Sequence, residues 1–156
     1  TVLLLATHFV AEPTALGRSR FLLGDGTTMS LEELARVDFS GLDLVILSAC
    51  STAGRGDTAE GAFGVDALLL AGGARAAVGT LWPVDSGAMA LLVPDMIAGL
   101  AAGLDKAEAL AMAQRRMARG ELGSGAYALP FFFTAPVICG NLLPWSPGTW
   151  STRHPC

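Results

Sequence analysis

Three short, almost uninterrupted apolar runs constrain the fold of this chain most strongly. They cover residues 1–6, 42–47 and 76–81. Runs of this length and composition are typical of strands that are buried on both faces of a parallel sheet. We therefore expect a strand at each run, with the first two buried on both faces.

Helix signals lie in the intervals between these runs. Ser30 is placed to cap a short helix that ends near residue 37, and Glu33 completes the pattern of a capping box. Thr58 can cap a second helix, which the glycines at 72 and 73 would end. Each interval between strands therefore contains one expected helix.

The second half of the chain predicts two longer helices and a further strand. One helix is expected at 86–100, interrupted near Pro94 because proline cannot donate the helical hydrogen bond. Asp105 is a good N-cap for the other, at 105–119. The last strand is expected at 131–139.

Alternation of strands and helices defines the fold class. It predicts βαβ units, right-handed crossovers and an α/β fold in which helices cover both faces of a mostly parallel sheet. The glycine-rich and proline-containing stretch at 12–26 is expected to be an exposed excursion that ends in a short ribbon near residues 20–23.

Composition and charge exclude several classes of protein. The 156 residues are 52% hydrophobic and 15% charged, which fits one globular domain. A formal net charge of −4 leaves no basic surface for a phosphate backbone, so no nucleic-acid partner is expected. No apolar run approaches the roughly 20 residues of a membrane helix, so we expect a soluble domain with no membrane partner.

The cysteines and histidines predict free thiols and no metal. Cys50, Cys139 and Cys156 are widely spaced and form no C-x-x-C pair, which favours a reducing, cytoplasmic location. Two histidines and three scattered cysteines provide no tetrahedral ligand set. The glycine pair at 72 and 73 follows a helix, not a strand, so no dinucleotide cofactor is expected either.

The two ends of the chain differ from its middle. No start methionine or signal peptide precedes the first apolar run, so we expect that an upstream part of the domain is missing. Residues 143–156 are rich in Pro, Trp, Ser and Thr and predict an irregular tail. The catalytic region is accordingly assigned to residues 1–142.

Two reactive side chains follow two of the expected strands. His8 comes after the first strand and Cys50 after the second. Neighbouring parallel strands lie about 4.8 Å apart and end at the same edge of a sheet, where the two side chains could converge. An imidazole beside a thiol suits acyl transfer. Spacing alone leaves a second interpretation open, in which Cys50 is a small buried hydrophobic residue at a strand end and His8 is a polar residue that faces a helix.

A series of motifs in a fixed order resembles CHAT domains, which are caspase-like cysteine peptidases of the caspase and separase clan. The motifs are A-T-H at 6–8, L-S-A-C-S-T at 47–52, A-E-G at 59–61, L-L-A-G-G-A at 69–74, G-T-L-W-P-V-D at 79–85, L-D-K-A-E-A-L at 104–110 and the closing segment 133–140. The resemblance implies a three-layer α/β/α sandwich and places this chain in its carboxyl-terminal catalytic half.

The resemblance also implies roles for individual residues. His8 would be the general base and Cys50 the nucleophile, with the backbone N–H groups of Phe9 and Cys50 forming the oxyanion hole. Phe9 stands where the family commonly has glycine, so the backbone donor is kept but a side chain is added.

Substrate recognition in this clan involves acidic residues, and the sequence departs from one of the patterns. Ser48 stands two positions before the cysteine, where several members have an acid. The resemblance to separase-like members makes Asp85, beside Trp82, the candidate substrate-binding acid, although Asp85 can equally serve as a helix N-cap. Asp57 and Glu60 are weaker acidic candidates and suit helix capping. His154 in the tail is a weaker candidate for the base than His8.

The leading hypothesis is a cysteine endopeptidase that cleaves a protein substrate without metal or organic cofactor. By resemblance, a fused or partner helical-repeat region of the TPR type would regulate it. One rival is a degenerate family member that serves as an interaction module, and a generic small-molecule α/β enzyme is a third interpretation.

Overall fold

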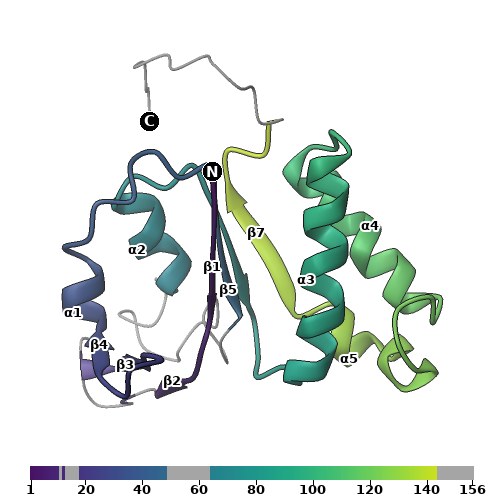
Figure 1. Ribbon diagram of the computed structural model, residues 1–156, viewed down its shortest axis with the longest axis horizontal. Coiled ribbons are helices and arrows are strands. Elements are labelled where there is room, and N and C mark those ends of the chain that lie inside the picture. Colours follow the sequence, from purple (N-terminus) through teal and green to yellow (C-terminus); the bar gives the residue numbers. More distant parts are fainter. Residues whose placement is uncertain (11, 13–17, 49–63, 144–156) are drawn as a thin grey trace.

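The central element of the structure is a four-stranded, mostly parallel sheet (Figure 1). The computed structural model describes residues 1–10, 12, 18–48 and 64–143. The strands follow the spatial order β1-β5-β6-β7. The first three are parallel, and β7 is antiparallel to β6. Their bounds are Val2–Ala6 for β1, Leu44–Ser48 for β5, Ala76–Thr80 for β6 and Pro136–Gly140 for β7.

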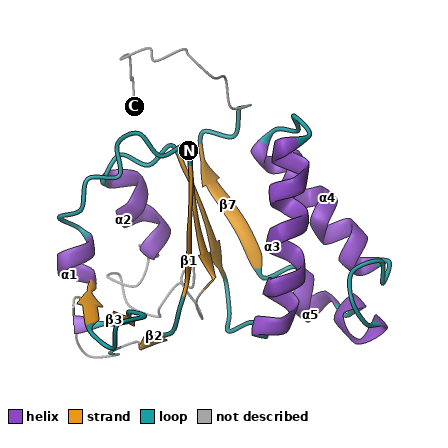
Figure 2. Cartoon of the chain, in the orientation of Figure 1, coloured by secondary structure: helices purple, strands orange, loops and turns teal. Residues whose placement is uncertain are grey.

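Helices cover both faces of this sheet (Figure 2). On one side lie α1 (Leu31–Leu34) and α2 (Val65–Ala71), and on the other lie α3 (Ser86–Ala101) and α4 (Lys106–Ala118). This is the expected α/β/α architecture. No helix in the described part of the chain has the length and apolar character needed to cross a membrane.

Two hydrophobic cores, one on each face, hold the layers together. The larger core joins Ile46 of β5 and Val78 of β6 to the buried side chains of α3 and α4, such as Met96 and Met117. The smaller core lies under α1 and α2 and includes Leu69. Side chains that leave water in this way provide most of the stabilisation of such a fold, about 25 cal/mol for each Å² of apolar surface.

The first strand is in the expected place, but the expectation that both its faces are buried is wrong. Exposure alternates along β1, so that Val2 is 46% and Leu4 43% exposed, whereas Leu3 and Leu5 pack against the smaller core. The reason is that β1 forms an edge of the sheet, and the larger core, with the helices that build it, involves β5, β6 and β7 but not β1.

Several local signals are confirmed. Ser30 and Glu33 form both hydrogen bonds of a capping box at the start of α1, which is one turn long. Asp105 caps α4 through the N–H of Glu108 at 2.7 Å. Gly72 is the C-cap of α2, and α2 begins after Gly64. The proposed cap Thr58 lies outside the described residues.

Two expectations for the second half need correction. α3 continues through Pro94 without interruption, because its buried side chains on both sides of the proline pack into the larger core and outweigh the lost hydrogen bond. The expected strand at 131–139 is a strand only from Pro136 onward. Its first part is the short helix α5 (Pro130–Phe133), which starts with a proline that suits the first helical position.

A small antiparallel sheet occupies the expected excursion. It consists of β2 (Phe9–Val10), β3 (Arg20–Leu22) and β4 (Thr28–Ser30), in that spatial order. The ribbon predicted near residues 20–23 corresponds to β3. This sheet follows directly on the end of β1, so the excursion is continuous with the strand that precedes His8 (Figure 1).

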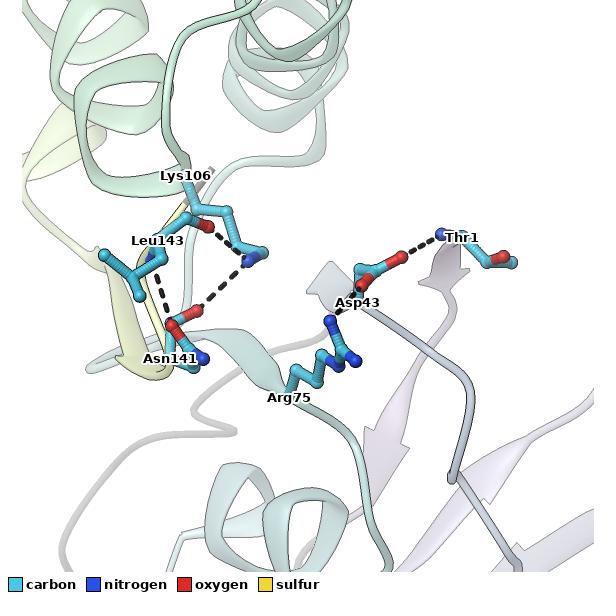
Figure 3. Close-up of polar contacts among 6 residues, drawn as sticks. All are labelled: Thr1, Asp43, Arg75, Lys106, Asn141 and Leu143. Carbon is cyan, nitrogen blue, oxygen red and sulfur yellow. Dashed lines mark hydrogen bonds and ion pairs between the residues drawn. The ribbon is translucent and has the colours of Figure 1, made fainter. Parts of the chain in front are cut away.

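A polar cluster lies at the amino ends of the parallel strands (Figure 3). Lys106 is only 4% exposed, and its Nζ donates hydrogen bonds to the carbonyl oxygens of Asn141 at 3.1 Å and Leu143 at 2.8 Å. Burial lowers the pKa of Lys106 below its ordinary value. Nearby, Arg75 pairs with Asp43 at 3.3 Å. The cluster ties the end of β7 to the start of α4, at the edge opposite to the one that His8 follows.

Candidate functional site

Several predicted site residues lie at or directly after the carboxyl ends of the parallel strands, namely Ser48, His8 and Trp82. Ala6 at the end of β1 pairs with Ser48 at the end of β5. His8 and Cys50 each stand two residues beyond this pair. His8 and Ser48 are described, whereas Cys50, Asp57, Glu60 and His154 lie outside the described residues. Parallel strands in register direct the chain segments after them to one edge of the sheet.

His8 is held at this edge by backbone contacts from two directions. The chain before it is fixed to β5, because the Thr7 N–H donates to the Ser48 carbonyl at 3.3 Å. The carbonyl of His8 itself accepts a hydrogen bond from the Leu22 N–H of β3 at 2.9 Å. The residue is exposed. An imidazole in this position is open to a substrate and to a neighbouring side chain.

The backbone N–H of Phe9 points away from the small antiparallel sheet. Leu22 N–H bonds to the carbonyl of His8, so the facing residues Phe9 and Phe21 form a non-hydrogen-bonded pair and the Phe9 N–H points away from β3. The Phe9 ring packs on Phe21 with 4.9 Å between centroids and belongs to the smaller core. The Phe9 side chain therefore has a structural role.

The segment after β6 is fastened at both of its ends. At one end, the indole Nε1 of Trp82 donates to the carbonyl of Phe131 at 3.0 Å, and the two rings stack with centroids 6.0 Å apart. At the other end, Asp85 caps α3 by accepting from the Ala88 N–H at 3.0 Å. The Asp85 carboxylate also lies beside Tyr127 and raises the pKa of that hydroxyl.

Asp85 thus serves as a helix cap, which was the alternative to substrate binding. We expect Asp85→Ala to lower the free energy of unfolding by about 1 kcal/mol, because the Ala88 N–H loses its acceptor. Asp85→Asn should stay within a few tenths of a kcal/mol of the parent chain, because asparagine caps as well as aspartate. Urea denaturation measures both values.

The same pair of variants tests the substrate-binding prediction for Asp85. A carboxylate that binds a basic side chain loses this ability in Asp85→Asn although the fold is kept. Weaker binding of a basic peptide by Asp85→Asn, at unchanged stability, would contradict a purely structural role. Equal binding would leave the cap as the function of Asp85.

The sequence analysis missed the aromatic residues that support this segment. Tyr127 lies in the 3₁₀-helix η3 (Gly125–Ala128), and Phe131 and Phe132 lie in α5. Successive edge-on contacts link Phe131 to Phe132 at 5.5 Å and Phe132 to Tyr127 at 5.3 Å. The run of three phenylalanines after Pro130 was an available signal, but it was assigned to a strand.

Among the described residues, no three His, Cys, Asp or Glu side chains gather where they could hold a metal ion. What this edge of the sheet offers is an exposed imidazole, a backbone N–H at Phe9 and a rigid segment at 82–85.

Comparison with known proteins gives one family match. The model of the CHAT domain matches residues 1–141. No curated protein matches the chain.

Proposed function

Because this chain belongs to the CHAT domain family, which is related to caspase-like peptidases, we propose that it is a cysteine endopeptidase in which Cys50 is the nucleophile and His8 the general base. The register of β1 and β5 carries this proposal. Ala6 and Ser48 are paired, and His8 and Cys50 each come two residues later in the sequence.

The reaction would proceed through a thioester. The His8 imidazole removes the proton of the Cys50 thiol, and the thiolate forms a bond to the carbonyl carbon of the substrate peptide. The C–N bond then breaks, and the imidazolium returns the proton to the leaving amine. A water molecule, deprotonated by His8, hydrolyses the thioester and releases the acid and the free thiol.

Backbone N–H groups would stabilise the negative charge that develops on the substrate oxygen. The orientation of the Phe9 N–H away from β3 supports a role for Phe9 as one donor, and the N–H of Cys50 is the proposed second. Such donors act strongly where water is excluded, and loss of one lowers kcat by about 10²- to 10³-fold in well-studied peptidases.

The pH dependence of Cys50 alkylation tests the dyad. Iodoacetamide labelling, followed by intact mass and peptide mapping, should show Cys50 reacting well below the free-thiol pKa of about 8.5, since a neighbouring imidazolium favours the thiolate. In His8→Ala the apparent pKa of Cys50 labelling should rise to the free-thiol value. At neutral pH, removal of His8 should therefore slow the labelling of Cys50.

Cys139 is a control within the same protein. Burial raises the pKa of its thiol, and the neighbouring Asp66 contributes in the same direction. Its labelling should therefore need a higher pH than that of Cys50 and should not respond to His8→Ala. Equal profiles for Cys50 in the two proteins would rule out the dyad.

Regulation and location complete the proposal. The family resemblance supports control of the peptidase by a TPR-type helical-repeat region in the same or a partner chain, acting on a protein substrate in the cytoplasm. Co-purification of such a region, with substrate cleavage that depends on it, would test this part.

A further inference from the structure

An aromatic platform lies beside the proposed nucleophile's strand. It consists of Trp82, in the segment after β6, and Phe131 of α5, whose rings stack with an interplanar angle of 30°. The Phe131 side chain is 54% exposed, which is unusual for a ring of this size. Leu129, 60% exposed, and Leu81, 41% exposed, flank the two rings in the sequence. The two rings and these exposed neighbours in the sequence are therefore all apolar.

The strand register places this platform next to the catalytic edge. In the sheet, β6 is the neighbour of β5, and Ile46 pairs with Val78. Continuing this register by two residues brings Thr80 opposite Ser48. Trp82 thus follows β6 by the same number of residues as Cys50 follows β5. Because β1 is on the other side of β5, the platform and His8 lie on opposite sides of the proposed nucleophile's strand.

The platform is rigid before any ligand arrives. The Trp82 indole is bonded to the carbonyl of Phe131, and the Leu81 N–H donates to the carbonyl of Ala135 at 3.0 Å. Phe132 makes edge-on contacts with both Phe131 and Tyr127, which restrict the Phe131 ring. A prearranged surface binds a ligand with little loss of its own conformational freedom.

The charges around the platform do not favour a basic ligand. The described carboxylate of this segment, Asp85, already accepts a hydrogen bond from the Ala88 N–H and lies beside the Tyr127 hydroxyl. A basic side chain would have to compete with both. An aliphatic or aromatic side chain would instead remove apolar surface of Trp82 and Phe131 from water.

We propose that Trp82 and Phe131 form a substrate subsite that receives a large apolar side chain of the cleaved peptide, and that Phe131 determines this specificity. This proposal rests on the proposed function, because the subsite is placed relative to Cys50 as nucleophile. It adds the class of substrate, namely peptides with leucine, methionine or phenylalanine near the cleaved bond.

Peptidyl acyloxymethyl ketones that alkylate Cys50 test the subsite. A series of four-residue probes carries, at one position at a time, Phe, Leu, Ala, Lys or Glu, and the second-order rate of Cys50 labelling is measured by mass. At one position, Phe and Leu should react about tenfold faster than Ala, and Lys and Glu should be no faster than Ala. In Phe131→Ala this preference should fall about tenfold, and in Phe131→Tyr it should be kept.

Two controls separate the possible outcomes. Iodoacetamide, which has no peptide part, should label Cys50 equally in the parent chain and in Phe131→Ala. Leu143→Ser changes a 70% exposed apolar residue at the opposite edge of the sheet and should leave the peptide preference unchanged. Thermal unfolding confirms that each variant is folded, and Phe131→Leu replaces Phe131→Ala if the latter is not.

The failure of the subsite differs from the failure of the proposed function. Suppose that labelling of Cys50 depends on His8, but that the probes show a preference for Lys or Glu, or an apolar preference that Phe131→Ala does not change. The subsite is then wrong and the dyad stands. If Cys50 shows no His8-dependent reactivity even toward iodoacetamide, both proposals are overturned.

Discussion

Peptide cleavage by this chain should disappear when Cys50 is replaced by alanine, with a loss of at least about 10³-fold in kcat/KM. Without the thiol no thioester can form, and the remaining backbone donors only polarise the substrate. His8→Ala should lower the rate by about 10²- to 10⁴-fold, because the thiolate then depends on the solvent pH. A fluorogenic apolar peptide, cleaved under single-turnover and steady-state conditions, measures both effects.

The double variant provides a further check on the dyad. If Cys50 and His8 act as a unit, the loss in the double variant should be close to that in Cys50→Ala alone, and not the product of the two losses. Cys139→Ala, which removes the thiol of β7, should retain full activity. Undiminished cleavage by Cys50→Ala would rule out Cys50 as the nucleophile. Stable binding of a partner protein that Cys50→Ala does not weaken, without any cleavage, would favour the interaction module.

The fold should be most sensitive at Gly140, the last residue of β7. Its φ of +103° is one that other residues rarely adopt, and an added Cβ would lie 2.5 Å from the carbonyl oxygen of Arg75 and 2.9 Å from the Cα of Ala76. Both atoms belong to the backbone at the start of β6, so neither can shift without moving the strand. We expect Gly140→Ala to lower the free energy of unfolding by roughly 3 kcal/mol, from the strained φ and the close contact together.

Gly103→Ala separates these two contributions. Gly103 has a similar φ of +95°, but nothing lies within 4 Å of an added Cβ. This variant should therefore lose only about 1 kcal/mol. Urea denaturation of both variants gives the difference, which measures the contact alone. Equal losses would mean that β7 can shift away from β6 at little cost.

The sequence predicted the fold well where local signals and burial agree. The capping box at Ser30, the carboxylate caps at Asp85 and Asp105 and the apolar runs of β5 and β6 all act within their own segment. The exposure of Val2 and Leu4 was not predictable in this way, because it depends on which strands the helices cover. Pro94 was misjudged for a similar reason, since packing across the helix decides whether it continues.

The site was predictable in part. The positions of His8, Ser48 and Asp85 were predictable, because each lies at or after the end of a recognisable strand or at the start of a recognisable helix, while their roles stay predictions. Phe131 and Tyr127 could not, because they come from a distant part of the sequence, and their contacts with Trp82 and Asp85 arise only when α5 packs beside the end of β6. Whether His8 and Cys50 act together remains a prediction that the alkylation experiment tests.

The attachment of His8 to two sheets has a consequence for the entropy of catalysis. One sheet holds the backbone before His8 through Thr7 and Ser48, and the other holds its own carbonyl through Leu22. The Thr7 hydroxyl adds a hydrogen bond to the carbonyl of Leu22. The torsional freedom of this backbone is therefore lost when the protein folds and not when a substrate binds. For the proposed base His8, a backbone fixed in advance in this way leaves more of the substrate's binding energy for lowering the barrier of the reaction.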